Sequence, residues 1–132
     1  MRDDEKKQIS EIIEEWAKAV REENINGILA NHSNNILMFD VPPPLQSKGI
    51  DAYKRSWNIF FSWSKKPVIF NINELEIITS NTVAYCHGIG QCMGIGSDDR
   101  EESLKFRLTI GFIKEDGHWI ITHEHHSLPS EA

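Results

Sequence analysis

The sequence predicts one α+β domain in which helices come first and an antiparallel sheet follows. Apolar residues recur at helical spacing in two segments of the first half, over 4–21 and around 50–61. Beyond them the pattern changes to four extended runs separated by turn residues, over 68–79, 82–95, 103–114 and 118–127. With 132 residues the chain can bury one good hydrophobic core but not two. We therefore expect a single domain over residues 1–132.

The first predicted helix covers 4–21, with acidic residues near its start, where they complement the helix dipole. Trp16 on its apolar side is expected in the core, and its indole N–H needs a partner if it is buried. A short helical segment over 28–31 follows. The apolar run 36–39 then predicts a short strand that ends at Asp40.

Three consecutive prolines, Pro42 to Pro44, exclude a helix interior or a central strand at this point, because proline has no amide donor and fixes φ. This stiff connection would hold the Asp40 carboxylate in place. Asp51 is expected to cap the next helix. The buried face of that helix is rich in aromatic residues: Ile50, Tyr53, Trp57, Phe60 and Phe61. Such a stripe is usual in a core and could equally form the wall of a cavity.

The last two predicted strands form a hairpin around Glu115-Asp116-Gly117. If Lys114 lies opposite His118, one face of the hairpin carries four polar side chains: Arg107, Thr109, His123 and His125. The opposite face carries five apolar ones: Phe106, Leu108, Ile110, Phe112 and Ile120. Neither is typical of a solvated surface, so we expect a pocket on the polar side and a packing surface on the apolar side. The many small residues of 82–95 predict bends, bulges or the close approach of another backbone.

Charge and composition exclude two classes of partner. The formal net charge is -6 and the two signs are interspersed, whereas nucleic-acid binding needs a clustered basic face. No apolar run approaches the ~20 residues needed to cross a bilayer, and the charged N-terminus is unlike a signal peptide. Cys86 and Cys92 lie too far apart along one predicted strand for a disulfide. We expect reduced thiols, a cytoplasmic location, and no binding to nucleic acid or membrane.

Trp16 and three longer segments form a recognisable pattern: FDVPPPLQSKGIDAY at 39–53, RLT at 107–109 and DGHWIITHEHHS at 116–127. In these residues the chain resembles the nuclear transport factor 2-like (NTF2-like) superfamily, and within it the SnoaL-like and ketosteroid-isomerase-like proteins. The resemblance implies a cone-shaped fold, with N-terminal helices packed on a curved antiparallel sheet that encloses an apolar cavity. It also implies a homodimer formed through the outer face of the sheet.

The resemblance places the catalytic aspartate of the steroid isomerases, a proton-shuttling base, at Asp40. The tyrosine and protonated aspartic acid that stabilise the enolate in those enzymes match Trp16 and Thr109 here, and neither is a strong acid. Another group must then stabilise the oxyanion, and Arg107 is the candidate. His123 or His125 would be the proton partner of the base.

These residues together predict a pocket for a small, largely apolar molecule that carries a carbonyl group or a ring. If catalytic, the protein performs acid–base chemistry of the isomerase, lyase or cyclase kind without a cofactor. The catalytic candidates are Asp40, His125, His123 and Arg107. The expected pocket residues are Trp16, Tyr53, Trp57, Phe61, His87 and Thr109.

Three alternatives stay open. The polar cluster could be a satisfied network that holds the hairpin together without a substrate. The same cavity could belong to a non-catalytic ligand-binding or protein-association domain, because this fold hosts many functions. His123 and His125 could form a zinc site with His87, but no metal-binding motif accompanies them, so no metal is expected.

Overall fold

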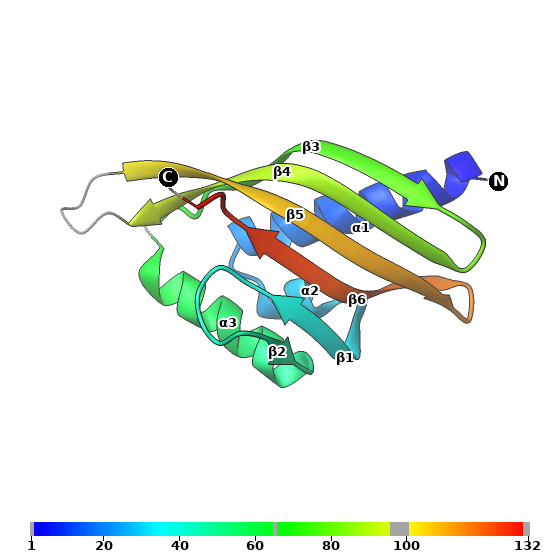
Figure 1. The fold of residues 1–132 in the computed structure, drawn as a ribbon, viewed down its shortest axis with the longest axis horizontal. Coiled ribbons are helices and arrows are strands. Elements are labelled where there is room, and N and C mark those ends of the chain that lie inside the picture. Colours follow the sequence, from blue (N-terminus) through cyan, green and yellow to red (C-terminus); the bar gives the residue numbers. More distant parts are fainter. Residues whose placement is uncertain (1, 65, 96–100, 131–132) are drawn as a thin grey trace.

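The computed structural model describes residues 2–64, 66–95 and 101–130. Its helices are α1 (Arg2–Arg21), α2 (Ile25–Leu29) and α3 (Ile50–Trp63) (Figure 1). Its strands are β1 (His32–Phe39), β2 (Ser47–Lys48), β3 (Phe70–Thr79), β4 (Val83–Ile95), β5 (Glu101–Glu115) and β6 (His118–Ser127). The two long helices and the four later strands agree with the sequence-based prediction. The short helix and β1 both begin earlier than predicted, and β2 was not predicted.

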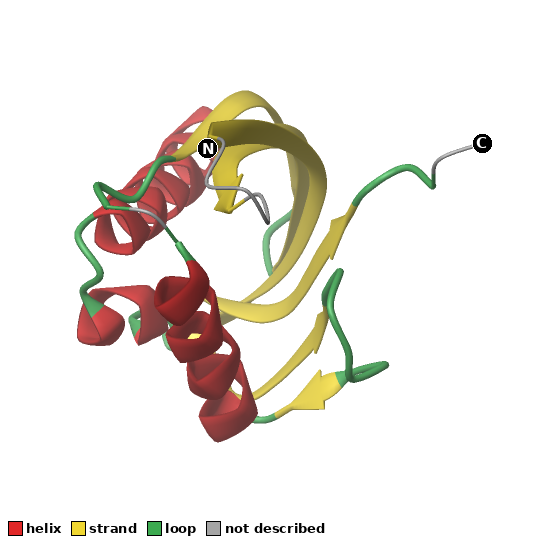
Figure 2. Cartoon of the chain, turned by 90° about the vertical axis from the view of Figure 1, so that its left-hand side faces the viewer, coloured by secondary structure: helices red, strands yellow, loops and turns green. Residues whose placement is uncertain are grey.

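The strands form one sheet in the order β2-β1-β6-β5-β4-β3. Neighbouring strands are antiparallel except for β1 and β6, which run parallel. The sheet curls strongly, and the helices lie on its concave side (Figure 2). The α+β class is confirmed. The predicted four-strand meander is enlarged by β1 and β2, which extend the sheet beyond β6.

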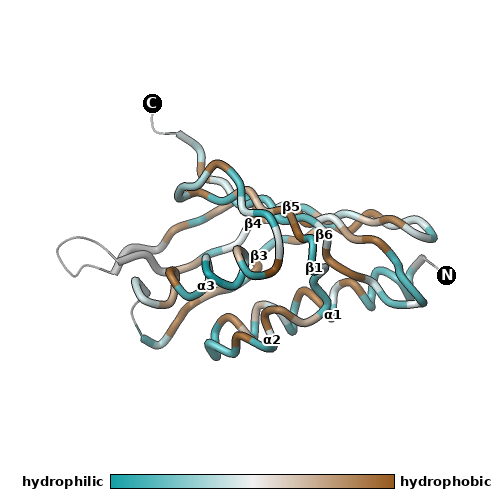
Figure 3. Tube along the Cα trace, turned by 90° about the horizontal axis from the view of Figure 1, so that it is seen from below, coloured by the Kyte–Doolittle hydropathy of each residue, from teal (hydrophilic) through white to brown (hydrophobic). Residues whose placement is uncertain are grey.

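The helices begin and end where their sequences favour it. Acidic residues occupy the first turn of α1 and basic residues its last turn, so both complement the helix dipole. Helix α3 begins after Gly49, whose φ of 92° favours glycine. Asp51 therefore lies in the first turn of α3 and is not its cap. Hydrophobic and hydrophilic residues alternate along both long helices (Figure 3), as expected for helices that bury one side.

The small residues of β4 permit close packing, as the sequence predicted. A Cβ atom added at Gly88 would lie 2.2 Å from the carbonyl oxygen of Glu74, so the neighbouring backbone comes too close for any side chain. At Gly90 an added Cβ would lie 2.3 Å from the Phe106 ring. A register shift between Ile72 and Glu74 accompanies this approach on the paired strand β3. These features let the sheet curl around the core.

Aromatic rings from four elements form the centre of the core. The Trp16 ring of α1 lies 5.2 Å from Phe70 of β3 and 6.0 Å from Trp57 of α3. Phe70 in turn stacks on Phe106 of β5 at 5.4 Å. These contacts hold the helices against the concave face of the sheet. None of the described helices combines the length and apolarity needed to cross a membrane.

Candidate functional site

A pocket of about 760 Å³ lies between α3, the connection from Asp40 to Lys48 and the concave face of the sheet. Its lining is mostly apolar and includes five aromatic rings: Trp57, Phe60, Trp63, Phe70 and Phe106. Small-molecule sites typically measure roughly 300–1,000 Å³ and combine apolar walls with a few polar groups. The pocket therefore has the size and the walls of a ligand site.

Asp40, directly after β1, is the one carboxylate among the described residues that line this pocket. Its Oδ1 accepts a hydrogen bond from the amide of Val41 at 2.8 Å. The same oxygen lies 3.5 Å from Nδ1 of His126, which projects from β6 and also lines the pocket. The side chains are 27% and 10% exposed. Asp40 and His126 thus form an ion pair at the border between the pocket and the protein interior.

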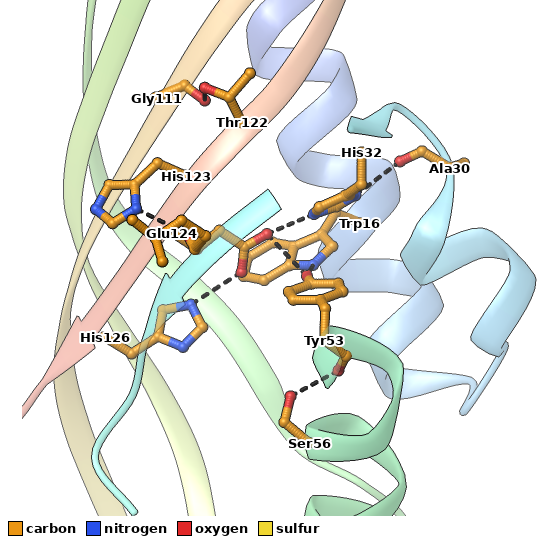
Figure 4. Close-up of polar contacts among 11 residues, drawn as sticks. Trp16, Ala30, His32, Tyr53, Ser56, Gly111, Thr122, His123, Glu124 and His126 are labelled. Carbon is orange, nitrogen blue, oxygen red and sulfur yellow. Dashed lines mark hydrogen bonds and ion pairs between the residues drawn. The ribbon is translucent and has the colours of Figure 1, made fainter. Parts of the chain in front are cut away.

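A buried polar network lies behind His126 (Figure 4). Its centre is Glu124 of β6, whose side chain is fully buried. Glu124 Oε1 lies 3.2 Å from His126 Nε2, an ion pair that falls short of hydrogen-bond alignment. Glu124 Oε2 accepts a hydrogen bond from the Tyr53 hydroxyl at 2.8 Å and lies 2.5 Å from Nε2 of His32. The Trp16 indole N–H donates to the Tyr53 oxygen at 3.0 Å. One carboxylate thereby joins α1, α3, β1 and β6.

The hydrogen bonds of this network lead from Trp16 and His32 to Glu124. An indole N–H can only donate, so Tyr53 accepts from Trp16 and gives its own proton to the carboxylate. Nδ1 of His32 lies 2.9 Å from the Ala30 carbonyl oxygen, which can only accept, so this nitrogen carries a proton. Trp16, Tyr53, His32 and the Oε2 atom of Glu124 thus all have hydrogen-bond partners, whereas Glu124 Oε1 meets His126 only as an ion pair. The Glu124 carboxylate is thus surrounded in the core by a hydroxyl donor and two imidazoles.

The environment favours the charged forms of Glu124 and His126. Burial alone would raise the pKa of Glu124, but His32 and His126 outweigh it and lower this pKa to about 2. Burial alone would lower the pKa of His126, but its contacts with Asp40 and Glu124 raise it to about 9. Burial and the Glu124 charge raise the pKa of Tyr53 well above its ordinary value, so Tyr53 remains a donor. At neutral pH, His126 is thus a cation held between two carboxylates.

The structure contradicts the predicted position of the pocket. Five predicted site residues lie on the outer face of the sheet, away from the helices: His87, Arg107, Thr109, His123 and His125. Arg107 is exposed, and its Nε donates to Ser127 Oγ at 3.0 Å. His123 donates from Nδ1 to the carbonyl of Leu37 at 2.7 Å. Asp40 faces the pocket on the opposite side. The predicted grouping of Asp40 with Arg107, His123 and His125 is therefore wrong.

Two one-residue differences separate the observed hairpin from the predicted register. The turn consists of two residues, Asp116 and Gly117, both with positive φ, so Glu115 lies opposite His118. A bulge beside Gly111 then leaves Thr122 as an extra residue on β6. Each of these differences moves the pairing by one residue. Because side chains alternate with a period of two, a total shift of two residues returns each side chain beyond the bulge to its predicted face.

Arg107 and His125 consequently share a face, as predicted, although they are not paired. The prediction was wrong about the environment of the two faces, because it placed the pocket on the polar face. The face of β5 that carries Phe106 and Phe112 is covered by the helices and encloses the pocket, whereas the Arg107 face is open in the single chain. Burying large apolar side chains outweighs enclosing polar ones, because each buried ring contributes about 2–3 kcal/mol.

The predicted aromatic residues occupy three different places. Trp57 lines the pocket, as predicted. Trp16 and Tyr53 are buried in the network behind it and are not lining residues. Phe61 packs against Trp57 with ring centroids 6.0 Å apart, and Phe60 lines the pocket in its place.

Three residues of the network were missed by the sequence analysis: His32, Glu124 and His126. Side-chain alternation along β6 puts Glu124 and His126 on the face opposite His123, which is the face that the helices cover. The alternating rings and aliphatic side chains of β5 mark the buried face, and Glu124 shares that face opposite Ile110. This signal was available in the sequence. His32 precedes the predicted strand, and no local pattern marks it.

The histidines of the outer face do not gather into a metal site. His87 and His125 both pair with Thr109, so they lie two strands apart, roughly 10 Å between their backbones. Among the described residues no group of three or more histidine, cysteine or acidic side chains is placed to hold a metal ion. Cys86 and Cys92 are free, and burial raises the pKa of the Cys86 thiol to about 12. Cys86 is therefore a poor nucleophile at neutral pH.

Comparison with known proteins gives both a family and a set of structural neighbours. The SnoaL-like domain family matches residues 9–131. An NTF2-like protein of unknown function from Pseudomonas putida is 31% identical, with a TM-score of 0.85 over 95% of this chain and 87% of that chain. A candidate ketosteroid isomerase from Shewanella frigidimarina is 18% identical, with a TM-score of 0.71 over 89% and 92% of the two chains. No protein of curated function matches the chain.

A candidate calcium/calmodulin dependent protein kinase II association domain from Xanthomonas campestris is 14% identical, with a TM-score of 0.77 over 94% of this chain and 87% of that chain. At such low identity, this likeness and the one to the Shewanella protein show the fold alone. The family match covers almost the whole chain, and the Pseudomonas protein supports it. The chain belongs to the SnoaL-like family of the NTF2-like superfamily.

Proposed function

We propose that the pocket binds a small, largely apolar molecule that carries a carbonyl group or a ring, and that Asp40 acts on this molecule as a general base. The observation that carries the proposal is the ion pair between Asp40 and His126 at the pocket, with Glu124 behind it. A carboxylate placed in an apolar pocket and fixed by buried partners is a common arrangement for proton transfer. The reaction would be of the isomerase, lyase or cyclase kind and would use no cofactor.

The proposed step is the removal of a proton from a carbon next to a carbonyl. The proton moves to the free oxygen of Asp40, and the electron pair of the C–H bond moves into the carbonyl group, which becomes an enolate. Return of a proton from Asp40 to another carbon completes an isomerisation, so proton and electrons balance, and exchange of the Asp40 proton with solvent before its return introduces deuterium in D₂O. The positive charge of His126 beside Asp40 stabilises the negative charge of the enolate.

Glu124 acts in this proposal as a positioning residue that does not touch the substrate. It keeps His126 protonated and holds its ring against Asp40. His126→Gln should therefore slow proton abstraction and change the pH profile of the remaining activity, since the buried cation is lost. A purely structural role would lower stability and leave the pH profile of the folded fraction unchanged.

Proton abstraction can be measured before the net reaction is known. The protein is incubated in D₂O with a panel of cyclic ketones, enones and esters, and proton NMR follows the loss of the signal next to the carbonyl. Asp40→Asn should slow this exchange by at least about 100-fold and leave ligand affinity intact. Asp51→Asn is the matched control, because Asp51 is exposed on α3 and does not line the pocket. Exchange that survives in Asp40→Asn would show that another group is the base.

The second candidate function is a non-catalytic ligand-binding or protein-association domain. Apolar side chains exposed on the outer face of the sheet favour it, since Ile78, Val83 and Tyr85 are 38%, 56% and 47% exposed. The structure named as a candidate association domain has the same fold. In this case no compound of the panel would exchange, and changes on the outer face would alter assembly.

We also propose that this outer face forms a homodimer, as the family resemblance implies. Tyr85→Lys would place a charge in the apolar surface and should convert the dimer to a monomer in size-exclusion chromatography with light scattering. A monomeric wild-type protein would refute the dimer and leave the pocket proposal intact.

The free thiols of Cys86 and Cys92 support a reducing compartment, for which we propose the cytoplasm.

A further inference from the structure

We infer that the ligand is an amphipathic anion: an apolar body with a carboxylate, sulfonate or phosphate group that Lys48 and Arg55 recognise. The inference rests on the proposed function, because it names the class of ligand for the same pocket. It comes from the charges that line the pocket and from their order along α3.

The pocket is cationic although the chain is acidic. The sequence has a formal net charge of -6. The charged residues that line the pocket are nevertheless one acid, Asp40, and three basic residues, Lys48, Arg55 and His126. Cationic groups beside low-dielectric apolar walls attract anions to a cleft. The local charge thus runs opposite to the charge of the chain as a whole.

Lys48 and Arg55 are available to a ligand. His126 and Asp40 form an ion pair with each other across 3.5 Å. In the part of the chain that the structure describes, neither Lys48 nor Arg55 takes part in an ion pair or a side-chain hydrogen bond, and both are exposed. An anionic group bound here would therefore not displace an internal partner of either cation. Arginine also offers a planar pair of donors that suits carboxylate and phosphate groups.

The positions along α3 give the ligand a direction. Lys48 of β2 lies just before the start of α3 (Figure 1). Arg55, Ile59 and Trp63 follow one another at four-residue intervals and all line the pocket, so they form one row along the helix. The cationic end of this row is near the start of α3 and the apolar end is at Trp63. The charged group of the ligand should lie near Lys48 and Arg55, and its apolar body should extend toward Trp63.

Two fluorescent probes with almost the same aromatic body test this inference. 1-Anilinonaphthalene-8-sulfonate carries an anionic group, and N-phenyl-1-naphthylamine lacks it. The wild-type protein should bind the sulfonate more tightly than the amine. Arg55→Gln and Lys48→Gln should each weaken binding of the sulfonate roughly 2- to 5-fold, the range of partly exposed ion pairs, and leave binding of the amine unchanged. Added salt should reduce the difference between the probes.

Two further variants locate the probes and control for charge. Lys54→Gln removes the same kind of charge from α3, but Lys54 is exposed and does not line the pocket, so both affinities should stay constant. Ala52→Trp adds a large ring at a lining position and should weaken binding of both probes, with circular dichroism to confirm folding.

The outcomes separate this inference from the proposed function. Equal affinities for the two probes, unchanged in Arg55→Gln and Lys48→Gln, would overturn the anion inference and leave the pocket proposal in place. Binding that Ala52→Trp does not weaken would show that the probes occupy another surface and would overturn the inference as well. Selective loss of the sulfonate supports the inference even if no panel compound exchanges with D₂O, because probe binding requires no catalysis.

Discussion

The two faces of β6 show how different the environments of neighbouring residues are in this protein. Glu124 and His126 point toward the helices, and their side chains are 0% and 10% exposed. His123 and His125 point outward, and their rings lie 5.0 and 5.4 Å from that of Phe39 on an open surface. Chemically similar side chains thus alternate between a low-dielectric interior and water. Position relative to the helices, and not residue type, decides which of them can take part in chemistry.

The largest expected effect is at the centre of the buried network. Glu124→Gln removes the only carboxylate on which both His32 and His126 converge in the described network and leaves partly exposed Asp40 as the one acid beside His126, so the free energy of unfolding should fall by about 3–5 kcal/mol. The matched control is Glu76→Gln on the outer face, which should change it by less than about 0.5 kcal/mol. Urea unfolding at pH 6 measures both. Similar losses of unfolding free energy in the two variants would show that the carboxylate on the inner face is no more important for stability than the one on the outer face.

The second effect is a dependence of stability on pH that originates in the inner face. The pKa of His126 is raised from 6.5 to about 9, so its contribution is complete below pH 6.5 and is lost as the pH rises through 9. The pKa of Glu124 is lowered from 4.5 to about 2, so its contribution is complete above pH 4.5 and is lost as the pH falls through 2.

Stability should therefore be greatest between these two windows and should fall by up to about 3 kcal/mol on the alkaline side. Unfolding midpoints in urea from pH 5 to 9 measure this fall. Glu124→Gln should make the alkaline slope shallower, because Asp40 remains but the second carboxylate that raises the pKa of His126 is gone. His125→Gln, on the outer face, should leave the slope unchanged. An unchanged slope in Glu124→Gln would contradict the assignment of the charge to His126.

A smaller effect is expected from single hydroxyl groups. Tyr53→Phe leaves the Trp16 indole N–H without its acceptor and takes one donor from Glu124, at a cost of about 1–3 kcal/mol. Tyr85→Phe makes the same chemical change on the outer face, where the hydroxyl has no hydrogen-bond partner within the described part of the chain, and should cost less than about 0.5 kcal/mol. Thermal unfolding of both variants at one protein concentration gives the comparison. Equal losses of unfolding free energy in the two variants would mean that the hydrogen bond between Trp16 and the Tyr53 hydroxyl does not connect α1 to α3.

The smallest expected effect tests whether the outer histidines contribute to activity. His125→Gln should change the free energy of unfolding by less than about 0.5 kcal/mol and should leave the rate of deuterium exchange unchanged within the error of the NMR measurement. His125 lies on the side of the sheet opposite Asp40, so it has no path to the substrate. A large loss of deuterium exchange in this variant would support the predicted arrangement, in which His125 is the proton partner of Asp40.

Much of the fold could be predicted because the signals are local. The helical spacing around Trp16 and Trp57 and the extended runs after Val68 correspond to the observed helices and strands. The small residues of β4 correctly predicted close backbone approach, at Gly88 above all. Asp40, which the family resemblance singled out as the base, lines the pocket, and its catalytic role stays a prediction.

The candidate site could be predicted only in part. The sequence indicated that Arg107 and His125 share a face, but it did not indicate that the helices cover the other one. The bulge that leaves Thr122 unpaired has no residue signature of its own, since threonine is an ordinary strand residue. The contribution of His32 depends on the parallel pairing of β1 with β6, two segments that are far apart in the chain.

The sequence by itself determined the class of fold, the family and the inventory of groups available for chemistry, because spacing, turn residues and composition act over a few neighbouring residues. The tertiary structure alone decided which side of the sheet is enclosed, and so which of the β6 side chains meet Asp40. The physical reason is that alternation along a strand fixes only relative orientation. Which face becomes the interior depends on where distant helices bury their rings, and Phe106 and Trp57 settle it for this chain.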